Sequence, residues 1–275
     1  MKIAIAGLGL IGGSFAKAIA SKTRHHIIGY DISRDVARRA YESGLIDDSG
    51  LDKFSEADIV LAALYPGTAA EFLKSNRSKF KRGAIVIDLC GVKRFVVGEV
   101  RELFSDVTYI GGHPMAGREL SGFGASVADL YEGASMILTP DDSTDPEALK
   151  TASNFFLSLG FAKIMITTPE HHDEMIAFTS QMAHIVSSAY VQNPVVDNFD
   201  GFSAGSFADM TRVAKLDENM WTELFMLNRD HLTEQLDIFI GNLTRFRKYI
   251  SEGDSEPLRE MLRDGREIKE RLTKK

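Results

Sequence analysis

The residues IAGLGLIGG, at positions 5–13, constrain the fold of this chain more than any other stretch. Gly7, Gly9 and Gly12 have the spacing G-x-G-x-x-G directly after the apolar run 2–6. Between a strand and a helix, this spacing gives a tight turn, close backbone approach to a pyrophosphate and close packing of the helix on the strand. A glycine-rich turn that binds no ligand is the alternative. The pattern predicts a dinucleotide-binding turn formed by Gly7, Leu8, Gly9, Leu10, Ile11 and Gly12.

The first 168 residues alternate between short apolar runs and segments with helical periodicity. The predicted strands are 2–6, 26–30, 58–64, 84–89, 108–110, 135–138 and 163–167. The predicted helices between them are 12–21, 34–43, 68–79, 94–104 and 146–159. Runs rich in Ile and Val are typical of strands that are buried on both faces of a parallel sheet. The alternation therefore predicts an α/β fold with a Rossmann-type, doubly wound and mostly parallel sheet.

From about residue 170 onward the strand pattern disappears and the periodicity is helical. The length of 275 residues suits two domains of roughly 100–200 residues each. We therefore expect a dinucleotide-binding domain over residues 1–168 and an all-helical domain over residues 169–275.

The composition argues against several classes of protein. The formal net charge of −7 is unlike a nucleic-acid-binding surface, which requires a basic patch. No apolar run reaches the roughly 18 residues of a membrane helix, and glycines divide the apolar N-terminal residues into a strand, a turn and a helix. The single cysteine, Cys90, excludes an internal disulfide and favours a reducing compartment. We expect a cytoplasmic protein without a nucleic-acid or membrane partner.

Asp31 ends the second predicted strand, where an acidic residue accepts hydrogen bonds from the ribose hydroxyls of a dinucleotide. Its carboxylate would repel a 2′-phosphate, so the sequence favours NAD over NADP. Arg34, three residues later, leaves NADP as the second choice. The alternative role for Asp31 is to cap the N-terminus of the following helix.

The stretch GGHPMAGREL, at positions 111–120, places His113 behind two glycines at the predicted carboxyl edge of the sheet. Open α/β folds bind their ligands at this edge. An imidazole with an ordinary pKa of about 6.5 can act as a general base near neutral pH. A histidine that is merely hydrogen-bonded in a loop is the alternative. Cys90 ends the fourth predicted strand, and no neighbouring residue in the sequence would activate its thiol.

The helical half contributes Ser180, His184 and Arg212 as candidate binding residues. Ser180 and His184 are four residues apart and therefore share one helix face. Arg212 suits a carboxylate because its planar guanidinium binds in a bidentate fashion. His171, His172 and His184 do not have the spacing of a known metal-binding motif, so we expect no metal site.

Several of these segments together resemble the prephenate dehydrogenase family, which includes arogenate dehydrogenases. The blocks that carry the likeness occur in the family's order over nearly the whole chain. They are GLGLIGGS, GYD, DLCGVK, HPMAG with LYEGASMILTP, HHDEMIAFTSQMAH, and SFADMTRVA followed by MW. The HPMAG and DMTRVA blocks are far more specific than the glycine pattern.

The resemblance implies an NAD-dependent enzyme of tyrosine biosynthesis that converts prephenate to 4-hydroxyphenylpyruvate by hydride transfer and loss of CO₂. It implies that His113 is the general base for the ring hydroxyl and that Arg212 binds a substrate carboxylate. His184 would line the same pocket, with Ser180 on its helix face. The glycines before His113 would let the backbone pass close to the cofactor. A homodimer built largely on the helical domain is also implied, whereas the mutase or regulatory domain of some relatives does not fit within 275 residues.

Two positions depart from the family pattern. Many relatives have a serine that contacts the substrate hydroxyl where this chain has Gly91, so that contact is missing or is made by another group. After HPMAG a serine is frequent, whereas this chain has Arg118. Arg118 either helps Arg212 to bind a dianionic substrate, as Lys93 could also do, or forms an ion pair with an acid such as Glu119.

Three other functions remain as alternatives. Arogenate dehydrogenase acts on a substrate with an amino group where prephenate has a keto group, and a few pocket residues decide between them. A β-hydroxyacid-type dehydrogenase would usually depend on a lysine in the helical half, where no clear candidate stands out. A non-catalytic dinucleotide-binding sensor would have kept the fold without turnover.

Overall fold

The computed structural model describes residues 1–273 and divides into two compact units. The first unit is Met1–Asn228, and the second begins at Arg229. The expected helical domain of residues 169–275 extends over two residues, 274 and 275, that lie outside the described part.

The first unit contains an eight-stranded sheet with the order β3-β2-β1-β4-β5-β6-β7-β8. The strands are β1 (Lys2–Ala6), β2 (His26–Tyr30), β3 (Asp48–Ser49), β4 (Ile59–Ala62), β5 (Ile85–Asp88), β6 (Thr108–Pro114), β7 (Ser135–Thr139) and β8 (Lys163–Ile166). Neighbouring strands in the described chain are parallel, except that β6 and β7 are antiparallel. The predicted doubly wound, mostly parallel sheet is confirmed.

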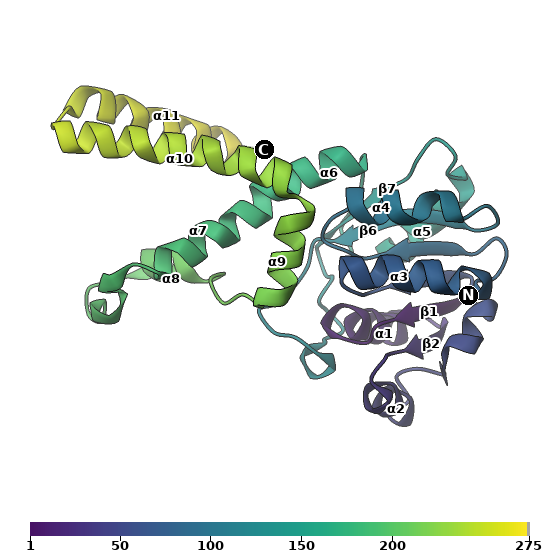
Figure 1. Cartoon of the computed structure of the whole chain (residues 1–275). Helices are drawn as coiled ribbons and strands as arrows, with labels where there is room; N and C mark the ends of the chain where they lie inside the picture. Colours follow the sequence, from purple (N-terminus) through teal and green to yellow (C-terminus); the bar gives the residue numbers. More distant parts are fainter. Residues whose placement is uncertain (274–275) are drawn as a thin grey trace. The chain divides into compact units, whose positions relative to one another are not determined.

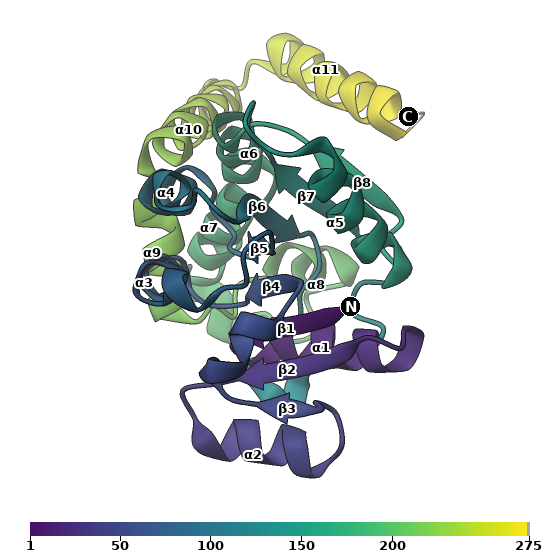
Figure 2. The same cartoon turned by 90° about the vertical axis from the view of Figure 1, so that its right-hand side faces the viewer.

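Helices cover both faces of this sheet. The helices of the first unit are α1 (Leu10–Lys22), α2 (Arg34–Glu42), α3 (Pro66–Asn76), α4 (Arg94–Val100), α5 (Pro146–Ser158), α6 (Pro169–Ile176), α7 (Met182–Val191), α8 (Gly205–Thr211) and α9 (Glu218–Leu227). α3 and α4 lie on one face, and α1 and α5 lie on the other (Figure 2). Each face has its own hydrophobic cluster, with Leu73 and Val97 in one and Phe15 and Phe156 in the other. Burial on both faces explains why the strands are almost continuously apolar.

Strand β6 is longer than the predicted 108–110. It continues through His113 and Pro114 because β7 runs antiparallel beside it, with His113 opposite Ile137 and Pro114 opposite Met136. Pro114 has no N–H to donate, and it stands in the last pair of the β6–β7 ladder, so few ladder hydrogen bonds are lost there. His113 is therefore a strand residue and not a loop residue. The two-residue strand β3 was not predicted, because so short a segment has no periodicity.

After β8 the elements of the described chain are helices joined by short turns and loops, with no further strand up to residue 273. Thr168 begins α6 by accepting a hydrogen bond on Oγ1 from the backbone N–H of His171 (3.2 Å). A π-helical turn, Ala177–Gln181, joins α6 to α7, which follow one another in Figure 1. The second unit consists of α10 (Arg229–Glu252) and α11 (Ser255–Thr273), which pack against each other. Within residues 1–273, no helix combines the length and apolar character needed to span a bilayer.

Candidate active site

The carboxyl ends of β1, β4, β5 and β6 lie at one edge of the sheet, because these strands are parallel. The glycine turn follows β1, Ala63 and Leu64 follow β4, Gly91 follows β5, and His113 lies near the end of β6. The strand order reverses between β1 and β4. Open α/β sheets bind their ligands at such a reversal, outside the carboxyl ends of the strands.

The glycine turn has the space that a dinucleotide requires. Gly7 has φ +86°, and a Cβ atom there would come 2.4 Å from the carbonyl oxygen of Ala63. A Cβ on Gly12 would come 1.8 Å from the carbonyl oxygen of Gly7, so glycine is needed for α1 to pack on β1. A Cβ on Gly9 would meet no described atom within 4 Å. The backbone is therefore open at Gly9, beside the N-terminus of α1, where a pyrophosphate fits.

Asp31 fixes the glycine turn from the end of β2. Its Oδ2 accepts a hydrogen bond from Leu8 N (2.8 Å), and its Oδ1 accepts one from Ser33 N (2.8 Å). The capping alternative for Asp31 is wrong, because Ser33 is the N-cap of α2 and its side chain accepts from Val36 N. The carboxylate of Asp31 is only partly buried, and Arg34 next to it is exposed. Asp31 is thus placed beside the dinucleotide turn with accessible oxygen atoms.

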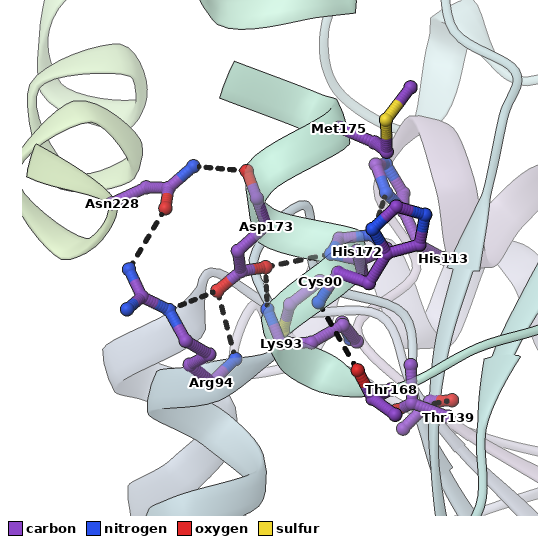
Figure 3. A network of polar contacts seen from close by, with 12 residues as sticks. Cys90, Lys93, Arg94, His113, Thr139, Thr168, His172, Asp173, Met175 and Asn228 are labelled. Atoms are coloured by element: carbon purple, nitrogen blue, oxygen red, sulfur yellow. Dashed lines mark hydrogen bonds and ion pairs between the residues drawn. The ribbon is translucent and has the colours of Figure 1, made fainter. Parts of the chain in front are cut away.

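His113 belongs to a row of three side chains that the sequence did not bring together (Figure 3). His113 Nδ1 is 2.9 Å from Nε2 of His172, and His172 Nδ1 is 2.7 Å from Oδ1 of Asp173. The carboxylate of Asp173 also accepts hydrogen bonds from the backbone N–H groups of Lys93 (2.7 Å) and Arg94 (3.0 Å). The row connects β6 with α6 and with the start of α4.

The three groups have shifted pKa values. Burial lowers the pKa of His113 well below its usual value, and the charges of His172 and Lys93 lower it further. Burial also lowers the pKa of His172, against the hydrogen bond with Asp173, which raises it. For Asp173, burial raises the pKa, but the hydrogen bonds from His172, Lys93 and Arg94 outweigh it and the net pKa is lowered. Both imidazoles are therefore neutral near pH 7, and the carboxylate is ionised.

Lys93 is not available to a substrate. Its side chain is fully buried, forms an ion pair with Asp88 and donates a hydrogen bond to the carbonyl oxygen of Gly112 (2.6 Å). The second oxygen of Asp88 accepts from the hydroxyl of Tyr109 (2.7 Å). The suggestion that Lys93 captures a dianion is wrong, because its charge is balanced inside the protein beneath His113.

The structure gives a packing reason for the two glycines before His113. A Cβ on Gly111 would come 2.4 Å from Thr139 Oγ1, and a Cβ on Gly112 would come 2.7 Å from the carbonyl oxygen of Asp88. Both glycines are required by packing inside the sheet, next to the Lys93–Asp88 pair. Packing alone therefore excludes side chains at both positions.

Gly91 faces the free side of the His113 ring. A Cβ on Gly91 would lie 3.9 Å from His113 Nε2 and 3.4 Å from Leu224 Cδ2. The neighbouring Cys90 is buried, its thiol donates to the carbonyl oxygen of Leu64 (3.4 Å), and burial raises its pKa well above the usual value. Cys90 is a protonated packing residue, and the open position beside His113 belongs to Gly91.

The helical residues approach the same region through α9. His184 Nδ1 donates a hydrogen bond to the backbone carbonyl of Ser180 (2.9 Å), and the His184 ring packs against Trp221 with 3.9 Å between ring centroids and 30° between the ring planes. Burial lowers the pKa of His184. Trp221 shares α9 with Leu224, the residue that lies next to Gly91. Ser180 lies in the π-helical turn, and it is its backbone carbonyl, not its hydroxyl, that holds the His184 ring.

Arg212 follows α8 and forms an ion pair with Glu119 (2.8 Å), which belongs to the segment after β6. The Arg212 side chain is 69% exposed. Arg118 is also exposed, and its guanidinium donates to the carbonyl oxygen of Ala125 (3.4 Å). The sequence offered Glu119 as an ion-pair partner of Arg118. In the structure Glu119 pairs with Arg212, and Arg118 contacts a backbone carbonyl.

The three histidines considered for a metal have separate partners. His171 contacts Glu174 (3.0 Å), His172 contacts His113 and Asp173, and His184 contacts Ser180. No group of three or more His, Cys, Asp or Glu side chains within residues 1–273 is arranged to hold a metal ion.

Asn228 was missed by the sequence reasoning, although its buried amide links four elements. It donates to the carbonyl oxygen of Asp173 (2.8 Å) and to Oε1 of Gln181 (2.8 Å), and it accepts from Arg94 (3.1 Å). Gln181 in turn donates to the carbonyl oxygen of Leu224 (3.2 Å). For His172 and Asp173, the available sequence signal was the ionisable run HHD at the start of the first helix after the sheet. No periodicity connects that run to His113.

Comparison with known proteins gives one consistent family. Residues 15–166 match the model for the prephenate dehydrogenase nucleotide-binding domain, and residues 168–264 match that for the prephenate dehydrogenase dimerization domain. Prephenate dehydrogenase of Bacillus subtilis is 33% identical over 93% of this chain and 72% of its own length.

Two solved structures cover almost all of the chain. Prephenate dehydrogenase from A. aeolicus, in complex with hydroxyphenyl propionate and NAD⁺, has a TM-score of 0.88 and 30% identity over 99% of this chain and 98% of its own. Synechocystis arogenate dehydrogenase has a TM-score of 0.85 and 27% identity over 99% of this chain and 100% of its own.

Proposed function

Because the chain belongs to the prephenate dehydrogenase family, we propose that it catalyses the NAD-dependent oxidative decarboxylation of prephenate to 4-hydroxyphenylpyruvate. The observation that carries the proposal is the position of His113. Its Nδ1 is held by His172, while its Nε2 faces Gly91 at the sheet edge that also bears the glycine turn. A general base and a dinucleotide turn at one edge are what such an oxidation requires.

The cofactor is assigned to the turn of residues 7–12, with the pyrophosphate at the open backbone of Gly9 and the N-terminal amides of α1. Asp31 would accept hydrogen bonds from the adenosine ribose, which favours NAD over NADP. When bound, NAD supplies the hydride acceptor. The protein's own task is then to orient the substrate carbinol and to remove the proton of its hydroxyl.

The substrate is assigned to the side chains around His113 Nε2. His184 and Trp221, whose rings pack against each other, would line the pocket for the six-membered ring, and Ser180 keeps His184 oriented through its carbonyl. Arg212 would exchange its exposed partner Glu119 for a substrate carboxylate, and Arg118 would add positive charge nearby. Exposed ion pairs are weak, so this exchange costs little free energy.

The chemistry requires one well-placed base. His113 Nε2 takes the hydroxyl proton as hydride leaves the carbinol carbon, and loss of CO₂ then gives an aromatic ring. Aromatisation supplies the driving force, so the protein mainly positions the reactants and polarises one O–H bond. A positioned base contributes about 10²–10⁴-fold.

The test is an NADH-absorbance assay with prephenate and arogenate, each with NAD and with NADP. We expect turnover with prephenate and NAD. A strong preference for arogenate would assign the alternative activity in the same family. Binding of NAD without turnover of either substrate would support the non-catalytic sensor.

We also propose a homodimer formed through the helical part of the chain, located in the cytoplasm. No residue of α8, α9 or α11 is buried, although these helices carry large apolar side chains. Phe202 is 91% exposed, and Val195 and Met226 are also exposed. Exposed apolar surface of this extent is typical of an interface. Light scattering after gel filtration would reject the dimer if it gave 30.4 kDa, the mass of one chain.

A further inference from the structure

His172 and Asp173 have no task in the proposed reaction, although both side chains are fully buried directly behind its base. The row His113–His172–Asp173 is closed at its inner end, because the carboxylate accepts backbone N–H groups from Lys93 and Arg94 (Figure 3). At its other end, His113 Nε2 lies beside Gly91, 3.9 Å from where a Cβ on that residue would be. The row therefore leads from the substrate position into the protein interior.

The contacts fix the position of each proton. An ionised carboxylate only accepts, so His172 Nδ1 carries a proton and donates it to Asp173. A neutral imidazole has one N–H, so His172 Nε2 is an acceptor. His113 Nδ1 must then donate to His172 Nε2, which leaves the lone pair of His113 on Nε2. Asp173 thus selects, through His172, the tautomer in which His113 is a base toward the substrate.

The surrounding charges decide where an added proton is most stable. The Lys93 ammonium lowers the pKa of both imidazoles, and it is itself paired with Asp88. Asp173, the carboxylate of the row, touches His172 through Oδ1 (2.7 Å) and not His113. Its Oδ2 also pairs with the Arg94 guanidinium at the longer distance of 3.4 Å. An added positive charge is therefore better placed on His172 than on His113.

We propose that His172 is the second carrier of the substrate proton and that Asp173 is its counter-charge; this proposal rests on the proposed function. The substrate O–H bond breaks and a bond forms to His113 Nε2, while the proton on His113 Nδ1 passes to His172 Nε2. The electron pair of the carbinol C–H bond leaves with the hydride to oxidised NAD. His113 ends neutral, and the charge of the imidazolium at His172 is balanced by Asp173. Both residues act through His113 and are positioning residues.

The first test needs no turnover. Nitrogen-15 NMR of the ligand-free protein at pH 7.5 reads the tautomer of each histidine. We expect His113 and His172 both to carry their proton on Nδ1. A proton on His113 Nε2 would overturn the relay, whatever substrate the enzyme prefers. Failure of the proposed function would instead appear as absence of turnover by the unmodified protein.

The second test is His172→Gln, because the amide oxygen still accepts from His113 Nδ1 but cannot carry the proton. We expect kcat/KM for prephenate to fall roughly 10–100-fold, with the Kd for NAD unchanged. His171→Gln is the matched control, because His171 lies on the same helix, is exposed, and has its ring 3.0 Å from Glu174 and outside the row. We expect the control to retain unmodified kinetics.

The pH profile separates the relay from a structural role. The active form has a neutral row, so kcat/KM falls as the pH drops through the pKa of the coupled pair. In His172→Gln only His113 remains, and its pKa is still lowered by burial, the largest cause, and by the charge of Lys93. We expect the acid limb of kcat/KM to move to lower pH in His172→Gln. In mixtures of H₂O and D₂O, we expect a curved proton inventory for the unmodified protein and a linear one for the variant. An unchanged acid limb together with an unchanged inventory would overturn the proposal.

Discussion

The two ends of the candidate site are built in different ways. The cofactor end is a backbone structure formed by consecutive residues 7–12. A side chain at Gly7 would clash with the carbonyl oxygen of Ala63, and one at Gly12 with that of Gly7, whereas the backbone at Gly9 is open. The reaction end consists of buried side chains that are distant in sequence, with His113 and His172 separated by 59 positions. The cofactor end works only if the backbone leaves space for a ligand, and the reaction end only if each imidazole carries its proton on the right nitrogen. Substitutions should therefore separate binding of the cofactor from the chemical step.

His113→Asn has the largest expected effect on that comparison. The asparagine amide can still donate to His172 Nε2, but it offers no base to the substrate. We expect kcat to fall by about 10²–10⁴-fold, whereas the Kd for NAD should stay within about twofold of the unmodified value. Fluorescence of Trp221, the single tryptophan, measures cofactor binding, and NADH absorbance measures turnover. Full activity in this variant would remove His113 from the mechanism.

The reverse separation is expected at the glycine turn. In Gly12→Ala the new Cβ would overlap the carbonyl oxygen of Gly7 at 1.8 Å, so α1 must shift away from β1. Overpacking of this kind costs about 1–3 kcal/mol in the free energy of unfolding. In Gly9→Ala the Cβ meets no described atom within 4 Å, so stability should be unchanged.

Both glycine variants should weaken NAD binding, and urea unfolding distinguishes them. Gly9→Ala is the sharper probe, because its methyl group would occupy the space assigned to the pyrophosphate. We expect its Kd for NAD to rise by about tenfold, which corresponds to about 1.4 kcal/mol. An unchanged Kd in Gly9→Ala would place the cofactor elsewhere.

The same difference explains what the sequence could predict. Strands 2–6 and 26–30 and the role of the glycine spacing follow from local patterns, because burial on both faces leaves a continuous apolar run. The contact of His113 with His172 depends on how α6 packs at the end of β6, which no periodicity encodes. The burial of Lys93 was missed too, because it depends on the packing of the chain after β5 against β6, where the ammonium donates to the carbonyl oxygen of Gly112 (2.6 Å).

Arg212 and Arg118 test the charge that captures the substrate. Arg212 forms an exposed ion pair with Glu119, whereas Arg118 donates to the carbonyl oxygen of Ala125. We expect Arg212→Gln to raise KM for prephenate by about 10–100-fold, in line with the loss of a charged hydrogen bond of roughly 1.5–3 kcal/mol. Arg118→Gln should raise KM by less than about threefold. A larger effect of Arg118→Gln would make Arg118 the main carboxylate ligand.

Gly91→Ser has the smallest expected effect and probes the reaction end most closely. The Cβ fits, because its nearest neighbours are Leu224 Cδ2 at 3.4 Å and His113 Nε2 at 3.9 Å, both ordinary contact distances. Stability should therefore be unchanged. The added hydroxyl could reach the substrate hydroxyl, and one further hydrogen bond is worth about 0.5–1.5 kcal/mol, or roughly 2–10-fold in kcat/KM. Gly91→Ala, which adds the methyl group without the hydroxyl, is the control. Equal kinetics of the serine and alanine variants would mean that His113 alone contacts the substrate hydroxyl.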